Sequence, residues 1–200
     1  MNKQKMTEQT KLAFEFIQKL YHETAFLIKE VENQLMQEEE SFEIIKPSGY
    51  AITSKNSTGL ESTNVNLWPI RKLGVMFAPS QFVEKGRSNI TAFVANLKMI
   101  YLRVLLDDPK INEPKLIYGC LYDFGKNGEL GKRLVKAEQL VSHIEYNESK
   151  FFKNLEKFEY DDVYIKLKGI LREIDLFDLN SSEEVHTKIV EPSLEMFRGV

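Results

Sequence analysis

A glycine-rich turn holds the residues whose types and spacing best fit ligand chemistry. It reads Gly-Lys-Asn-Gly-Glu-Leu-Gly-Lys-Arg from Gly125 to Arg133, after a predicted strand and before a predicted helix. Such a turn can present free backbone N–H groups to an anion, and Lys126, Lys132 and Arg133 would add positive charge. The segment raises the hypothesis of a phosphate or nucleotide ligand, bound by an enzyme or a sensor.

The spacing in this turn departs from the phosphate loop of the Walker type. Five residues separate Gly125 from Gly131, where that motif has four, and Arg133 takes the place of the Ser or Thr that holds magnesium. Glu129 also brings a negative charge into the turn. A strand-to-helix turn with solvated charges therefore fits these residues better than a phosphate-binding loop does.

A second group of residues is mostly acidic and would suit the active site of a metal-dependent nuclease. The predicted order of helix, strands, helix and strand over residues 7–123 resembles, in outline, the core of the restriction-endonuclease-like fold. The sequence Glu113-Pro-Lys115 follows Asp107 and Asp108, as an acid and a Glu-x-Lys pair should. However, the proline places the pair in a turn, and Asp107 stands only six residues before Glu113. A divergent nuclease-like domain is therefore an alternative that these residues support poorly.

Residues that bind transition metals or act as nucleophiles are few. His22, His143 and His186 lie on three different predicted helices, and none has a second His or Cys at metal-ligand spacing. Cys120 is the only cysteine, and its apolar surroundings predict a buried, unreactive thiol. We assign no catalytic residue, no metal site and no cofactor from the sequence.

Composition narrows the class of protein. The 200-residue chain has a formal net charge of -3 and an isoelectric point near 5.8, so it lacks the basic excess that duplex nucleic acid favours. No apolar run reaches the roughly 18 residues of a membrane span. With one cysteine and no signal peptide, the chain is expected to be cytoplasmic. Neither a membrane nor a nucleic acid is expected as a partner.

The order of predicted elements is typical of an α+β protein. We expect a single domain over residues 1–200, with a mixed, mostly antiparallel sheet flanked by helices. Residues 1–41 are predicted to form a long N-terminal helix, and residues 42–180 the sheet with inserted helices. Residues 181–200 are predicted to form the C-terminal helix.

Two stretches in the sheet region give specific predictions. The run from Lys115 to Asp123 is apolar on both faces, which predicts a central strand. The stretch over residues 89–106 is ambiguous, because its apolar residues match helical spacing but also alternate as in a strand. Its length and a candidate cap at Ser88 or Asn89 favour a helix.

The last third of the chain contains a long predicted strand and a helix start. The strand covers residues 162–179, and its apolar phase slips at Gly169, which predicts a β-bulge. Ser181 followed by Glu184 is typical of a capping box. The helix that follows is expected to be disturbed near Pro192.

The longest helical signal in the chain runs from Thr7, a candidate N-cap, to about Glu40. One apolar stripe follows the helical repeat and is expected to cover the sheet: Phe14, Ile17, Tyr21, Ile28, Val31 and Leu35. Leu12, Phe16 and Phe26 lie outside this stripe, toward the other side of the helix. A helix that is apolar on more than one side is usually buried on more than one side. These three residues are therefore the predicted partner-binding residues.

The function that these observations favour is protein–protein interaction. We expect a non-catalytic cytoplasmic interaction or regulatory protein that self-associates or binds a partner protein through its N-terminal helix. The two alternatives are a phosphate- or nucleotide-binding enzyme or sensor that uses residues 125–133, and a divergent restriction-endonuclease-like domain.

Overall fold

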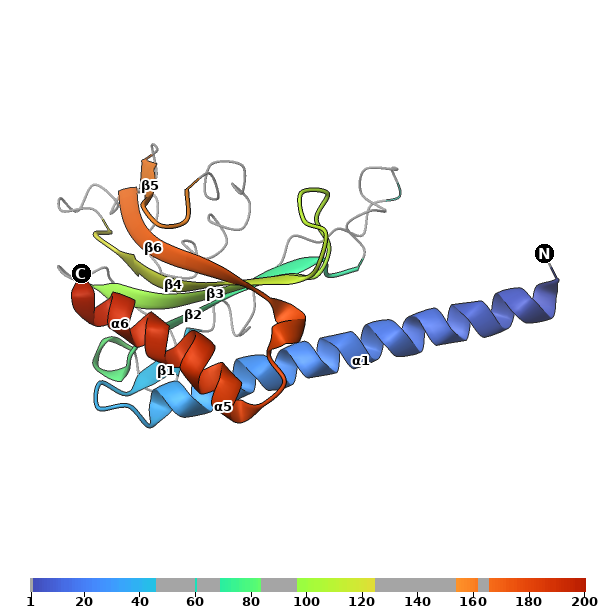
Figure 1. The fold of residues 1–200 in the computed structure, drawn as a ribbon, viewed down its shortest axis with the longest axis horizontal. Helices are drawn as coiled ribbons and strands as arrows, with labels where there is room; N and C mark the ends of the chain where they lie inside the picture. Colours follow the sequence, from blue (N-terminus) through green and yellow to red (C-terminus); the bar gives the residue numbers. More distant parts are fainter. Residues whose placement is uncertain (1, 46–59, 61–68, 84–96, 125–153, 162–165) are drawn as a thin grey trace.

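The computed structural model describes residues 2–45, 60, 69–83, 97–124, 154–161 and 166–200. Helices and strands follow in this order: α1 Lys3–Met36, β1 Phe42–Ile44, β2 Lys72–Pro79, η2 Ser80–Phe82, β3 Lys98–Leu105, β4 Lys115–Tyr122, β5 Phe158–Asp161, β6 Lys166–Asp175, η4 Leu176–Asp178, α5 Ser182–Val185, η5 His186–Val190 and α6 Glu191–Gly199. The prediction of an α+β domain with a long N-terminal helix, a sheet and a C-terminal helix is confirmed (Figure 1).

The six strands form one sheet in the order β1-β2-β3-β4-β6-β5. Every described pairing is antiparallel, so the described part of the sheet is not mixed. The first four strands follow one another as neighbours, and β6 then pairs with the far side of β4. β4 is therefore central, as its two apolar faces predicted.

Helices cover one face of the sheet. The second half of α1 and the continuous run of α5, η5 and α6 lie on the same side of the strands (Figure 1). Phe42 of β1 and Phe197 of α6 meet edge to face, with ring centroids 5.0 Å apart. The Lys98 ammonium donates to the Phe197 carbonyl over 2.9 Å, which satisfies an orphan carbonyl at the end of α6. A second cluster of buried residues, including Met76, Tyr101 and Leu171, occupies the other face.

The predicted helix over residues 89–106 is wrong where the structure describes it. Residues 98–105 form β3, which pairs along its length with β4, and seven of its eight residues are buried. Because both faces of β3 are covered, nearly every position is apolar, and such a run also contains helical spacing. Residues 89–96 lie outside the described residues.

No β-bulge occurs at Gly169. The pairing of β4 with β6 runs without a break from Lys115 opposite Asp175 to Tyr122 opposite Lys168. Gly169 instead makes room for close packing, because an added Cβ would lie 2.8 Å from the Leu121 side chain. The change in apolar phase therefore reflects packing on two faces of β6 and no change of register.

The C-terminal helix begins as predicted. The Ser181 hydroxyl accepts from the Glu184 N–H over 3.1 Å, and the Glu184 carboxylate accepts from the Asn180 N–H over 2.8 Å. The expected disturbance near Pro192 is a π-helical turn, η5, in which the Glu191 N–H donates to the His186 carbonyl five residues earlier. The helix thus continues through the proline with one wider turn.

Candidate functional site

The first half of α1 extends beyond the sheet. Every residue from Lys3 to Phe16 is exposed, and no other helix or strand among the described residues runs alongside this stretch (Figure 1). At 1.5 Å per residue, these residues span about 21 Å. We call residues 3–16 the arm. Because the arm is continuous with a helix that is anchored further along, its first turn does not have to nucleate alone.

The second half of α1 anchors the helix on the sheet. Ile28, Val31 and Leu35 are buried in the core beneath the strands, at successive steps of three and four residues. The Tyr21 hydroxyl, five residues after the last residue of the arm, donates to the Ile70 carbonyl over 3.1 Å. The sheet-covering role predicted for the apolar stripe is therefore confirmed for these three core residues.

The arm is apolar although it is exposed. Of the eight large apolar side chains in the described structure that are about half exposed or more, six lie on α1. They are Met6, Leu12, Phe14, Phe16, Phe26 and Met36, with exposed fractions from 49% to 69%. Phe14 was predicted to cover the sheet, and it does not because the sheet ends before the helix does. Single apolar residues are normal on a surface, but this concentration makes α1 the candidate site.

One side of α1 carries a line of residues that leads away from the arm. Leu12, Phe16, Leu20, Glu23 and Leu27 follow one another at steps of four, four, three and four residues. This spacing places them on one side of the helix. We call these five residues the α1 stripe.

The α1 stripe ends in a groove between α1 and the segment that joins β6 to α5. The groove has a volume of about 250 Å³ and is lined by Leu20, Glu23, Thr24, Leu27, Leu176, Phe177, Leu179 and Asn180. Phe177 is 58% exposed there. The lining is mostly apolar, so the groove suits a Leu or Phe side chain. The sequence did not predict the side of the groove that Leu176 and Phe177 form, because the short turn η4 was predicted to be the end of a strand.

The three predicted partner-binding residues are all exposed, but they do not form one patch. Leu12 and Phe16 belong to the α1 stripe, and their exposed fractions are 59% and 65%. Phe26 is 69% exposed, and ten residues along an α-helix turn it about 80° away from Phe16. The structure therefore brings Leu12 and Phe16 together and leaves Phe26 on a different side of α1.

Charge is divided unequally along α1 and the turn that follows it. Residues 3–19 contain four lysines and two glutamates, a net charge of +2. Residues 20–40 contain one lysine and six glutamates, a net charge of -5. The first turn has no acidic residue and the last turn has no basic residue, an order that opposes the helix macrodipole. Within α1 itself, residues 20–36 contain three glutamates and one lysine, so the second half of the helix has a net charge of -2 and the first half one of +2.

Part of the acidic charge is paired within the chain. Arg198 of α6 lies 2.8 Å from the Glu40 carboxylate and 3.3 Å from that of Glu38. The hydrogen bond from Arg198 lowers the pKa of Glu40, and hydrogen bonds from Ser182 and Gln34 lower the pKa of Glu30. Both carboxylates therefore stay ionised at neutral pH, Glu30 within α1 and Glu40 in its ion pair with Arg198 after the helix.

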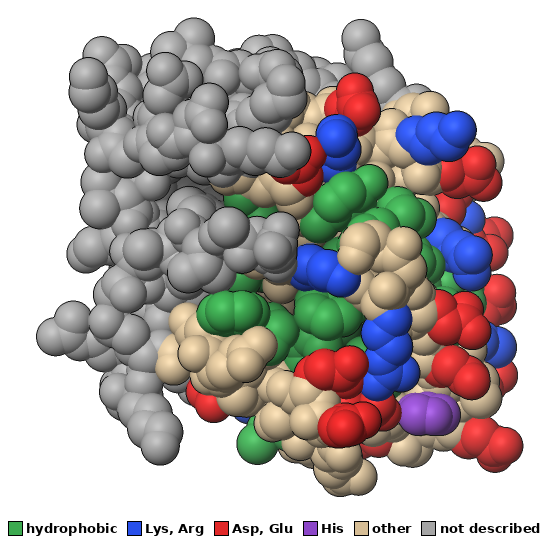
Figure 2. All heavy atoms as spheres, turned by 90° about the vertical axis from the view of Figure 1, so that its left-hand side faces the viewer, with side chains coloured by type: hydrophobic (Ala, Val, Ile, Leu, Met, Phe, Trp, Pro, Cys, Tyr) green, Lys and Arg blue, Asp and Glu red, His purple; other side chains and the backbone are tan. Residues whose placement is uncertain are grey.

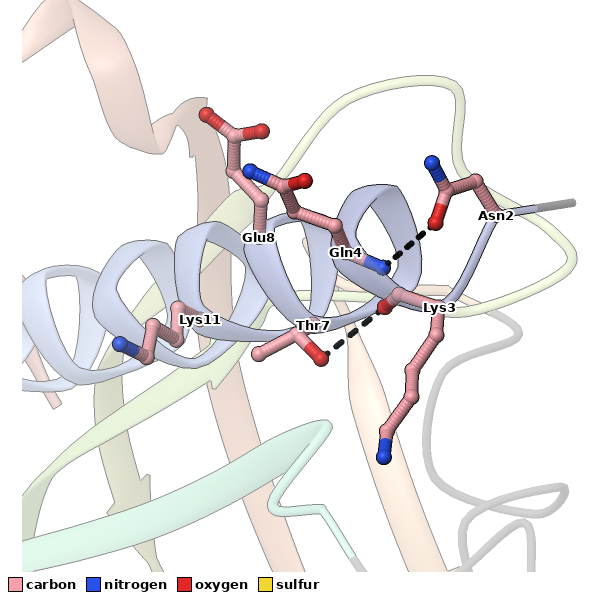
Figure 3. Close-up of a pocket in the computed structure, with 6 residues that line it drawn as sticks. All are labelled: Asn2, Lys3, Gln4, Thr7, Glu8 and Lys11. Atoms are coloured by element: carbon pink, nitrogen blue, oxygen red, sulfur yellow. Dashed lines mark hydrogen bonds between the residues drawn. The ribbon is translucent and has the colours of Figure 1, made fainter.

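The tip of α1 carries a shallow depression. Figure 3 shows the six residues that line it, all from the start of one helix: Asn2, Lys3, Gln4, Thr7, Glu8 and Lys11. The Gln4 N–H donates to the Asn2 side chain over 3.1 Å, so Asn2 is the N-cap and the predicted cap at Thr7 is wrong. The Thr7 hydroxyl donates to the Lys3 carbonyl over 3.0 Å. These contacts explain how the helix begins and define no ligand site.

The sequence predicted an anion-binding site in the glycine-rich turn. Lys126, Lys132 and Arg133, with the turn over residues 125–133, lie outside the described residues.

Three residues of the nuclease alternative, Asp107, Asp108 and Lys115, lie at one end of the sheet in ion pairs. Asp107 pairs with Arg71 over 2.6 Å, Asp108 pairs with Lys72 over 3.0 Å, and Lys115 pairs with Asp175. Within the described ranges, no three His, Cys, Asp or Glu side chains gather as a metal-binding group.

The single thiol and the described histidines are separate from one another. Cys120 is buried in β4, and burial raises the pKa of its thiol to about 12. His22 is exposed on α1, and His186 Nδ1 lies 3.2 Å from the Gln34 side-chain oxygen where α5 and η5 meet α1. His143 lies outside the described residues. The thiol is therefore unreactive in the folded chain, as its apolar surroundings predicted.

The end of the molecule that faces away from the arm has a mixed surface. Figure 2 shows acidic and basic side chains beside each other around a small apolar area in the described part of this face. Neither sign of charge prevails there, in contrast to the two halves of α1. None of the described helices combines the length and the apolar character that crossing a bilayer requires.

Comparison of the chain with protein-family models, with curated proteins and with solved structures found no match. The candidate site therefore rests on the geometry of α1 and the groove beside it.

Proposed function

We propose that this protein is a non-catalytic interaction or regulatory protein of the cytoplasm, which binds another protein chain through the arm of α1. The observation that supports this most directly is the exposure of Met6, Leu12, Phe14 and Phe16 on a helix that projects from the sheet. The bound chain is either a second copy or a different protein.

The energetics of the arm favour a bound state. Burying an exposed Leu, Met or Phe side chain contributes roughly 1.5–3 kcal/mol. Association costs about 4–15 kcal/mol. Burial of four such side chains is enough to offset a cost in the lower or middle part of that range. A helical segment of this length is marginally stable in water by itself, so packing against a partner would also hold it helical.

The test compares the wild type with a double variant, Leu12→Glu and Phe16→Glu. Each chain carries a fluorescent protein at its C-terminus, at the end opposite to the arm (Figure 1). Its sedimentation is measured both in purified form and in a lysate of its own host. We expect the wild type to sediment as a complex in at least one of the two conditions, and the double variant as a monomer in both. Loss of two buried side chains should weaken binding about 100-fold or more.

A matched control separates loss of apolar contact from added charge. Gln18 is exposed on α1 and lies outside the α1 stripe, so Gln18→Glu adds a negative charge without removing an apolar side chain. This variant should sediment as the wild type does, and all variants should keep the far-UV circular dichroism of the wild type. If the double variant sediments as the wild type does, binding through the arm is wrong.

A further inference from the structure

We infer that the arm's partner is a second copy of this chain, with the two α1 helices packed antiparallel and Phe16 of each copy seated in the groove of the other. This inference rests on the function proposed above and adds the identity and the orientation of the partner. It stands on two observations, which are the opposite charges of the two halves of α1 and the position of the groove on the α1 stripe.

Charge selects the orientation. In an antiparallel pair with its two-fold axis near Leu20, residues 3–19 of each copy, with a net charge of +2, lie along residues 21–37 of the other. Those residues hold three glutamates and one lysine, a net charge of -2. In a parallel pair, like charges would lie together along the whole contact. The helix dipoles favour the same antiparallel orientation. It brings the partially positive start of each helix toward the partially negative end of its partner. A second copy therefore supplies the complementary charge that α1 lacks.

The α1 stripe sets where the two helices meet. In an antiparallel pair with its two-fold axis near Leu20, Phe16 of one copy lies opposite Thr24 of the other. Thr24 lines the groove, together with Leu27 and Phe177. Because a two-fold contact is made twice, each copy both donates a Phe16 side chain and receives one. One side of α1 thus carries both the Phe16 side chain that is inserted and the groove that accepts it, as self-association requires.

The orientation is tested with nitroxide labels on the purified full-length chain. Gln4 and Gln18 are exposed and fourteen residues apart, so they share a face of α1 that lies away from the α1 stripe. Single variants Gln4→Cys and Gln18→Cys can be labelled selectively, because the Cys120 thiol is buried. In an antiparallel pair with its two-fold axis near Leu20, two labels at position 4 are offset by about 48 Å along the helix axes, and two labels at position 18 by about 6 Å. The distance between labels at position 4 should therefore exceed that at position 18 by more than about 20 Å. Equal distances at the two positions would show a parallel pair and overturn the inference.

The groove is tested by Phe177→Glu, read by sedimentation equilibrium. This side chain is 58% exposed in the single chain, so the variant should fold as the wild type does, by far-UV circular dichroism. We expect the dimer dissociation constant to rise roughly tenfold or more, and Gln18→Glu to leave it within about twofold. An unchanged dissociation constant in Phe177→Glu would overturn the seating of Phe16 in the groove.

Failure of this inference is distinguishable from failure of the proposed function. If the purified wild type is a monomer at 100-fold the concentration used in the lysate, no second copy is bound and the inference is overturned. If the same chain still sediments as a complex in the lysate, and Leu12→Glu with Phe16→Glu abolishes that complex, the arm binds a different protein. The proposed function then stands without the dimer.

Discussion

At the scale of the residue, Gly119 shows how tightly the centre of the sheet is packed. Its φ is +148°, a backbone conformation that residues with a side chain rarely adopt. A Cβ added there would lie 2.1 Å from the Ile170 carbonyl oxygen and 3.0 Å from the Leu171 Cα. Both of these atoms belong to the backbone of β6, so no rotation of a side chain can relieve the contact. The pairing of β4 with β6 therefore depends on glycine at this position.

Replacing this glycine should destabilise the whole domain. Backbone strain costs about 1–3 kcal/mol, and overpacking adds a similar amount, so Gly119→Ala should lower the free energy of unfolding by at least about 2 kcal/mol. Urea denaturation followed by circular dichroism measures the change. Gly199→Ala is the control, because nothing lies within 4 Å of its added Cβ, and it should change the free energy of unfolding by less than about 1 kcal/mol. Equal losses in the two variants would contradict this account.

Single residues were predictable where their chemistry is local. The burial of Cys120 and the capping contacts of Ser181 and Glu184 depend on neighbours in the sequence, and the structure confirms them. Gly169 was assigned to a β-bulge, although it accommodates the side chains of Leu121 and Phe158 from neighbouring strands. Those neighbours are distant in sequence, so no local pattern could distinguish close packing from a bulge.

At the scale of the element, the two long helices differ in how their first turns are held. Ser181 caps a helix that is packed against the sheet, whereas Asn2 caps the free arm. Losing a side-chain cap costs about 1 kcal/mol of helix stability. For the C-terminal helix, loss of the cap should lower the stability of the whole domain, because Val185 and Ile189 of its first turns are buried in the core.

Removal of the two caps should therefore affect the free energy of unfolding of the domain differently. We expect Ser181→Ala to lower the free energy of unfolding of the domain by about 1 kcal/mol. In the monomer, Asn2→Ala should leave the free energy of unfolding unchanged and reduce only the helical signal at 222 nm. The reason is that the arm unfolds locally while the core stays folded. Thermal and urea unfolding of both variants at low protein concentration check this. A lower unfolding midpoint in Asn2→Ala would show that the arm is part of the cooperative core.

Elements were predictable where only one repeat fits the sequence. The residues of α1 match a helix and no strand, so its existence was clear and only its ends moved, to Lys3 and Met36. β3 is buried on both faces, and its apolar residues satisfy both repeats. Only pairing with β2 and β4 decides between helix and strand there, and the apolar pattern within residues 98–105 does not show that pairing.

At the scale of the whole molecule, the candidate site arises from a mismatch in length. α1 is longer than the surface that the sheet offers to it, so its apolar residues are buried at one end and exposed at the other. The sequence shows that α1 is apolar on several sides, and it predicts Leu12, Phe16 and Phe26 as partner-binding residues, which are all exposed in the structure. It does not show where the sheet ends, or that the segment after β6 turns back to form a groove with Leu20 and Leu27.

This mismatch predicts a gradient of stability along the monomeric chain. In the Leu12→Glu, Phe16→Glu variant, amide hydrogens of the arm should exchange with protection factors below about 10, because the arm opens without breaking any tertiary contact. Amides of β3 and β4 should exchange only through global unfolding, since these strands are central and buried. Hydrogen–deuterium exchange resolved by peptide measures both in one experiment. In the wild type, protection of the arm should rise with the fraction of chain in the complex, while protection of β3 and β4 rises only with global stability. Strong protection of the arm in the monomeric variant would mean that residues 3–16 pack against their own chain, and the apolar surface that supports the proposed interaction would then be part of the core.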